Sequence, residues 1–147
     1  MKATKLKNIF VEGAIAPSKI ADSIAAHQSK TNIGAHDIFL GQVRADDVDG
    51  KVVTAIEFTA QQEMANQVCY DIRESVFENF PVTCMHIYHS IGTVKAGELC
   101  IFVFVSAGHR QTVFEALPYL VDELKAKLPI FGKELFEDQT HQWKENR

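Results

Sequence analysis

The sequence predicts an α+β fold in which helices pack on a mostly antiparallel sheet. Segments typical of strands alternate with segments of helical periodicity, in the order β-α-β-β-α-β-β-α-β. Two pairs of successive strand segments are separated by short turns that contain glycine, which is typical of antiparallel hairpins. We therefore expect one helical layer on one face of the sheet and a single domain over residues 1–147.

The strand segments share β-branched and aromatic residues bounded by Gly, Pro or polar turns. They are residues 8–14, 36–44, 52–58, 82–89, 99–105 and 130–136. The Asp49-Gly50 step favours a hairpin turn between the second and third strands, and residues 90–97 are expected to form another turn region. Residues 99–105 are all apolar, a pattern that predicts a strand buried on both faces.

Three segments have the features of helices. The first runs from Pro17 to about Lys30, since proline is tolerated in the first turn of a helix. The second covers residues 61–80, where apolar side chains recur every four residues. The third runs to about Lys127, and Pro118 inside it is expected to kink or break it.

The composition excludes several classes of protein. It is 46% hydrophobic and 23% charged, near the average for globular domains. With 15 basic and 19 acidic residues the net charge is −4, so the chain lacks the basic footprint of a nucleic-acid binder. Its longest apolar run is far shorter than the ~20 residues of a membrane-spanning helix. We expect a cytoplasmic protein that binds neither nucleic acid nor membrane.

The cysteines and histidines predict no metal site. The three cysteines are widely spaced and form no CxxC pair. His86 and His89 lie three apart on one strand, so alternation places them on opposite faces of the sheet. His27, His36 and His141 have no partner at the spacing of metal ligands.

A candidate anion site follows the apolar strand. Three small residues, at positions 106–108, precede His109 and Arg110 at the start of the third helix. The free N–H groups and the positive end of the helix dipole favour an anion there, and Arg110 can bind a phosphate through two hydrogen bonds. His109 can donate a hydrogen bond or act as a general acid or base. The alternative is a surface turn with a solvated arginine and a structural histidine.

Cations also gather at two other places. Arg44 closes the second strand, and Lys125, Lys127 and Lys133 flank Pro129. A solvated arginine, or lysines that offset the helix dipole, would explain them without any function. A lysine held in a cleft among other cations can instead serve as a nucleophile or an acid-base group.

Five short motifs occur in order along residues 37–134. They are residues 39–44 (FLGQVR), 56–58 (IEF), 89–92 (HSIG) with 97–98 (GE), 106–110 (SAGHR) with 114–116 (FEA), and 124–134 (LKAKLPIFGKE). Together they resemble the catalytic (large) subunit of molybdopterin synthase, which is the large subunit of the molybdopterin-converting factor. The resemblance covers about two-thirds of the chain.

The resemblance implies an α/β hammerhead fold and a homodimer. Two copies of a small ubiquitin-like sulfur carrier would bind to this dimer to give a heterotetramer. The family's reaction, a step of molybdenum cofactor biosynthesis, converts cyclic pyranopterin monophosphate to molybdopterin. Two sulfurs come from thiocarboxylates at the C-terminus of the carrier and form the dithiolene. The implied protein is a sulfurtransferase that needs no cofactor or metal of its own.

The resemblance also implies roles for particular residues. Lys125 would be the catalytic lysine beside the carrier tail, where charge or proton transfer could activate the thiocarboxylate. Arg44 would line the same pocket. His109 and Arg110 would bind the pterin phosphate, reaching the site of the neighbouring subunit.

The chain departs from the family at three positions. Gly132 stands where the family has a second functional lysine, Ser90 where it often has arginine, and Thr59 where it often has an aromatic residue. Lys133 is the expected substitute for the second catalytic lysine, although neighbours along a regular strand face opposite ways.

Three hypotheses for the function follow from the sequence. They are an active synthase subunit, a homologue with lost or altered catalysis, and an unrelated α+β module that binds a small phosphorylated ligand.

Overall fold

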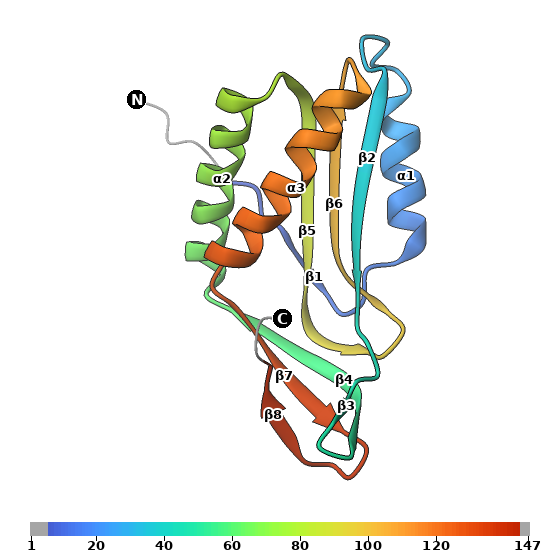
Figure 1. Ribbon diagram of the computed structural model, residues 1–147, viewed down its shortest axis with the longest axis vertical. Helices are drawn as coiled ribbons and strands as arrows, with labels where there is room; N and C mark the ends of the chain where they lie inside the picture. The colour runs from blue at the N-terminus through green and yellow to red at the C-terminus, as the bar shows by residue number, and fades with distance from the viewer. Residues whose placement is uncertain (1–5, 145–147) are drawn as a thin grey trace.

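The computed structural model describes residues 6–144, and Figure 1 shows how its elements are arranged. The helices are α1 (Pro17–His27), α2 (Gln62–Asn79) and α3 (Arg110–Lys127). The strands are β1 (Phe10–Glu12), β2 (Ala35–Gln42), β3 (Asp47–Val48), β4 (Lys51–Ala60), β5 (Val82–Lys95), β6 (Leu99–Ala107), β7 (Ile130–Phe136) and β8 (His141–Trp143). Within this part of the chain, none of the helices is long and apolar enough to cross a bilayer.

The strands form one sheet, and its main path runs β2-β6-β5-β4-β7-β8. β1 pairs with β5 in parallel, whereas the pairings along the main path are antiparallel. The predicted α+β fold with a mostly antiparallel sheet is therefore confirmed. The hairpin expected between the second and third predicted strands is wrong, because β2 pairs with β6 and the turn at Asp49-Gly50 joins β3 to β4. Strand β8 was not expected, because it forms from the polar tail and is recognisable only by its pairing with β7.

Strand β5 is longer than expected, because residues 90–95 continue the strand instead of turning. Its first half pairs with β6 and its second half pairs with β4. Gly92, with φ +86°, lies where the strand passes from one neighbour to the other, and a Cβ atom there would lie only 2.6 Å from Glu12 Oε1. The turn is confined to the residues around Gly97, whose φ is +92°.

The two faces of β6 are covered by different helices, which corrects the expectation of a single helical layer. Ile101, Val103 and Val105 pack in a core cluster with residues of α2 and α3. Phe102 and Phe104 point to the other face, where they form a second cluster with residues that include one from α1. The predicted burial of this strand on both faces is confirmed, and each apolar face needs its own cover.

Helix α3 continues through Pro118 without the expected break. Pro118 lies on the exposed side of the helix, where water can bond the carbonyl of Phe114 that has no intrahelical partner. The helix is therefore continuous, with Arg110 at its first residue and Lys127 at its last.

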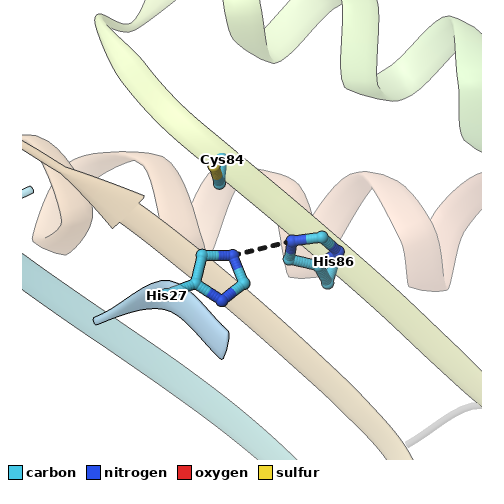
Figure 2. A group of neighbouring side chains, drawn as sticks. All are labelled: His27, Cys84 and His86. Carbon is cyan, nitrogen blue, oxygen red and sulfur yellow. Dashed lines mark hydrogen bonds between the residues drawn. The ribbon is translucent and has the colours of Figure 1, made fainter. Parts of the chain in front are cut away.

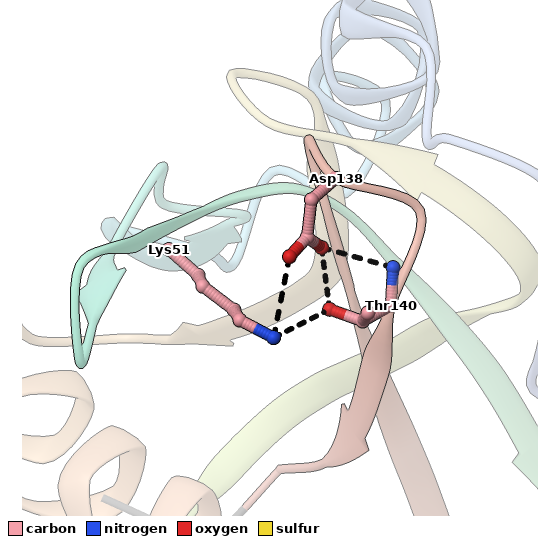
Figure 3. A network of polar contacts seen from close by, with 3 residues as sticks. All are labelled: Lys51, Asp138 and Thr140. Atoms are coloured by element: carbon pink, nitrogen blue, oxygen red, sulfur yellow. Dashed lines mark hydrogen bonds and ion pairs between the residues drawn. The ribbon is translucent and has the colours of Figure 1, made fainter.

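A polar network ties together two turns at the end of the molecule formed by β3, β4, β7 and β8 (Figure 3). Lys51 Nζ lies 3.2 Å from Asp138 Oδ2 and donates a hydrogen bond to Thr140 Oγ1 at 3.1 Å. The backbone N–H of Thr140 donates to Asp138 Oδ1 at 3.0 Å. The hydrogen bonds from Thr140, followed by the bond and charge of Lys51, lower the pKa of Asp138 to about 2. The network holds the β7–β8 hairpin against the start of β4.

The substitution Asp138→Asn should loosen this hairpin without unfolding the protein, since the amide lacks the charge that holds Lys51. Backbone amides of β8 are expected to exchange with solvent severalfold faster, while those of β6 exchange as in the parent; hydrogen exchange followed by NMR measures both. Because the folded pKa of Asp138 is below its ordinary 3.8, its contribution is complete above pH 4 and is lost as the pH falls through about 2. Equal β8 protection in parent and variant would contradict this role.

Candidate functional site

A pocket of about 160 Å³ lies beside the C-terminal end of α3, where the two halves of the sheet meet. Its walls combine apolar side chains with two lysines and one histidine. The lining residues are Phe58, His89, Ile101, Leu124, Lys125, Leu128, Ile130, Gly132 and Lys144. A pocket whose walls combine apolar side chains with a few converging cations is suited to a ligand that carries an anionic group.

Lys125 reaches the pocket from the last turn of α3. Its neighbour Leu124 is buried under the helix, which fixes this turn against the sheet. The Nζ atom of Lys125 lies 5.8 Å from the centre of the Phe39 ring on β2, at the range of a cation–π contact. The structure therefore places the predicted catalytic lysine in the pocket.

Lys144 is a second pocket lysine that the sequence analysis missed. It follows β8, and its backbone N–H donates to the carbonyl of Gly132 at 2.7 Å. That bond places Lys144 beside Gly132, which has no side chain of its own. Only the pairing of β8 with β7 could have identified it, because in the sequence it belongs to an unremarkable polar tail.

Gly132 faces the pocket and leaves little room for a side chain. A Cβ atom at this position would lie 3.0 Å from Ile56 Cγ2 and 3.5 Å from Phe58 Cε1. The first distance is tight, so Ile56 would have to shift by a few tenths of an ångström to accept a larger residue.

The pKa of His89 depends on its burial and on the charges of both pocket lysines. Burial is the main cause that lowers the pKa of His89 to about 4, and the charges of Lys125 and Lys144 lower it further. Its Nδ1–H donates to the backbone oxygen of Ser90 at 2.8 Å, which opposes the shift. At neutral pH the imidazole is therefore uncharged, and the positive charge of the pocket comes from its lysines.

Lys133 does not line the pocket. It neighbours Gly132 along β7 and so points to the opposite face of the strand. Its Nζ atom lies 3.5 Å from Glu57 Oε1 and 5.9 Å from the centre of the Trp143 ring.

The other three predicted site residues also lie outside the pocket. Arg44 is largely exposed, with Nε 3.4 Å from Asp46 Oδ1. His109 is the exposed N-cap of α3, and Arg110 begins the helix. With a rise of 1.5 Å per residue, Arg110 and Lys125 are about 22 Å apart along the helix axis. One copy of the chain therefore cannot bring these two residues to the same small ligand.

A second group of reactive side chains lies on the α1 side of the sheet (Figure 2). His27, Cys84 and His86 bring one ligand atom each within 4.8 Å of one another. Sequence spacing gave His27 no partner for a metal, and the group forms only because the last turn of α1 brings His27 to a strand 59 residues away. The prediction that His86 and His89 lie on opposite faces is confirmed, since His89 lines the pocket beside α3.

Comparison with known sequences gives a consistent result. The family model described as "MoaE protein" matches residues 14–127. The molybdopterin synthase catalytic subunit of Rattus norvegicus is 36% identical over 118 residues, which cover 78% of this chain and 56% of the relative. The same-named protein of Pyrococcus abyssi is 37% identical over 110 residues, covering 75% and 74%. The chain thus spans about 56–60% of the length of the mammalian relatives.

Solved structures share the fold. Molybdopterin synthase from Staphylococcus aureus superposes with a TM-score of 0.81 at 25% identity, covering 96% of this chain and 99% of the other. A complex of subunits 1 and 2 of the molybdopterin-converting factor from Helicobacter pylori gives a TM-score of 0.79 at 17% identity, covering 94% and 90%. The second likeness concerns the fold alone.

The substitution Lys144→Ala should raise the pKa of His89 above about 4, because a nearby positive charge that disfavours protonation is removed. The pKa should stay below the ordinary 6.5, since burial remains the larger cause. NMR titration of the imidazole measures it. Lys127→Ala is the matched control, as Lys127 lies 2.8 Å from Glu123 outside this pocket and should leave His89 unchanged. An unchanged pKa in Lys144→Ala would show that Lys144 does not face His89.

Proposed function

Because the chain belongs to the MoaE protein family, we propose that it is the catalytic subunit of a molybdopterin synthase. The proposed reaction moves two sulfurs from thiocarboxylated carrier proteins to cyclic pyranopterin monophosphate and builds the dithiolene of molybdopterin. The observation that carries the proposal is the convergence of Lys125 and Lys144 on one largely apolar pocket. Both the thiocarboxylate and the substrate phosphate are anions, so a cationic pocket in an acidic protein suits this chemistry.

Lys125 is the proposed catalytic residue. Its side chain lines the pocket beside Leu124 and Leu128, so its ammonium charge is available to an anion that enters there. Placed beside the end of a carrier tail, it stabilises the negative charge that develops at the thiocarboxyl group as the sulfur is transferred.

Two lysines are candidates for the second cationic role. Lys133 is the candidate from sequence, and Lys144 is the candidate from geometry. The geometry supports Lys144, because it lines the pocket beside Gly132 whereas Lys133 pairs with Glu57 on the other face.

The phosphate of the substrate is proposed to bind His109 and Arg110 of a second copy in a homodimer. The supporting observation is the separation of about 22 Å between Arg110 and Lys125 along α3. His109 makes no side-chain cap, so the N–H groups of the first turn remain available to an anion. Arg44, exposed at the end of β2, is a further proposed substrate contact.

The proposed partner is a small ubiquitin-like sulfur carrier whose extended C-terminus enters the pocket. A pocket of about 160 Å³ is large enough for a few residues of an extended tail but not for a folded surface. Two carriers and two copies of this chain would form a heterotetramer. We also propose a cytoplasmic location, consistent with three free cysteines at positions 69, 84 and 100.

A homologue with altered catalysis is the second candidate function, and Gly132 is the observation that favours it. Such a protein would bind the carrier or a pterin phosphate without forming product. Single-turnover conversion of cyclic pyranopterin monophosphate, with carrier binding measured in the same sample, separates the two candidates. Carrier binding without product would overturn the synthase proposal, and product formation would exclude the alternative.

The substitution Lys125→Ala should lower the single-turnover rate at least about 100-fold, the usual cost of losing one electrostatic contact to a reacting group. Thermal stability and carrier affinity should change little, because the lysine carries no core packing. Lys127→Ala, two residues along the same helix, is the matched control and should keep the parent rate. A Lys125→Ala variant that turns over like the parent would remove this residue from the mechanism.

The substitution Lys144→Ala should lower the rate at least tenfold, whereas Lys133→Ala should change it by less than threefold. Adding Gly132→Lys to Lys144→Ala should recover part of the loss, since a lysine at this position would return a cation to the pocket wall. The rates are measured with saturating carrier. The opposite ranking, with Lys133→Ala the slower variant, would assign the second role to Lys133.

A further inference from the structure

The group formed by His27, Cys84 and His86 lies outside the proposed reaction pocket and has no part in the proposed chemistry. Cys84 and His86 are two residues apart on β5, so their side chains share one face of the strand. His27 comes from the last turn of α1 and is buried, with 6% of its surface exposed. Figure 2 shows the two imidazole rings turned toward each other with the sulfur beside them.

We propose that His27, Cys84 and His86 form a Zn²⁺ site that fastens the end of α1 to strand β5. Two imidazole nitrogens and a thiolate are a donor set that zinc favours, and a water molecule would complete four-coordination. The inference goes beyond the proposed function, because His86 and the pocket residue His89 lie on opposite faces of β5.

The distances are close to those of a zinc site. His27 Nε2 and His86 Nε2 are 2.9 Å apart, and the three ligand atoms lie within 4.8 Å of one another. Zn–N bonds of about 2.0 Å and a Zn–S bond of about 2.3 Å at tetrahedral angles require N···N of about 3.3 Å and N···S of about 3.5 Å. The ring nitrogens would separate by a few tenths of an ångström, and the N···S distances would shorten by at most about 1.3 Å, which the partly exposed sulfur allows.

The hydrogen bonds of His27 already orient it as a metal ligand. Its Nδ1 lies 2.6 Å from the backbone oxygen of Ser23, and a carbonyl oxygen can only accept, so Nδ1 carries the proton. The lone pair of Nε2 therefore points at the centre of the group. A backbone carbonyl that holds the second ring nitrogen is the usual support of a zinc-bound histidine.

The groups that occupy the other ligand atoms are easily displaced. Lys7 Nζ donates to His86 Nδ1 at 3.3 Å, which leaves the proton of His86 on Nε2, directed at His27. Lys30 Nζ donates to Cys84 Sγ at 2.9 Å. Both lysines are exposed, so they can move into solvent when the metal binds. The His86 proton then moves to Nδ1, and the thiol proton of Cys84 is released to solvent.

The test uses the untagged full chain, since tag histidines would bind metal themselves. Titration with Zn²⁺ against a chromophoric chelator should show one ion per chain, and Zn²⁺ should raise the melting temperature. Co²⁺ in place of Zn²⁺ should give the visible bands of a tetrahedral ion and a sulfur-to-cobalt charge-transfer band. The charge-transfer band reports a thiolate ligand directly.

Two variants decide whether the residues named are the ligands. Cys84→Ser should weaken Zn²⁺ binding more than tenfold and abolish the charge-transfer band, and His86→Gln should weaken binding to a similar extent. Cys100→Ser, which changes another partly buried thiol, is the matched control and should bind like the parent. If His86→Gln fails to fold, Cys84→Ser alone decides through the cobalt spectrum. Binding that survives Cys84→Ser, binding of copper but not zinc, or no binding by the parent would each overturn the proposal.

Discussion

The burial of β6 on both faces is the constraint on which the rest of the molecule depends. Its side chains alternate between two clusters, one under α2 and α3 and the other on the α1 side. An apolar strand in the middle of the sheet cannot leave either face in water, because each exposed side chain would forfeit about 2 kcal/mol of burial. Covering the first face brings the end of α3 to the pocket, and covering the second brings His27 to β5.

The pocket places an uncharged histidine, His89, beside two lysines. Burial lowers the pKa of His89 and keeps the imidazole uncharged, and the positive charges of Lys125 and Lys144 lower the pKa further. Lys125 and Lys144 come from segments joined only through β7 and β8, so their approach is a tertiary property of the sheet. An anion bound in this pocket would contact two ammonium groups and several apolar side chains.

Local patterns in the sequence were sufficient for most of the fold. The seven apolar residues at 99–105 and the four-residue periodicity of α2 each reflect a local preference that the structure keeps. The turn at Asp49-Gly50 also forms, but it joins the two-residue strand β3 to β4, whereas β2 pairs with β6. The course of residues 90–95 was predicted wrongly, because glycine signals both turns and tight strand crossings. Only the packing of Gly92 against Glu12 distinguishes the two.

The candidate site could be predicted only where it depends on a local motif rather than on contacts made by folding. Lys125 stands in a recognisable motif, and the structure places it in the pocket. Lys144 and the contact between His27 and His86 depend on chain segments that meet only after folding, so no spacing along the sequence could reveal them. The orientation of Lys133 follows from strand alternation, which the sequence did indicate.

The double pairing of β5 has a mechanical consequence. The strand is shared between two halves of the sheet, and the change of partner occurs near Gly92. One wall of the pocket, with Lys125 and His89, belongs to the half that carries the helices, and the facing wall, with Gly132 and Lys144, belongs to the other. Strand β5 and the two-residue connection from α3 to β7 both link these walls, so a small rotation of one half against the other would change the spacing between the two ammonium groups.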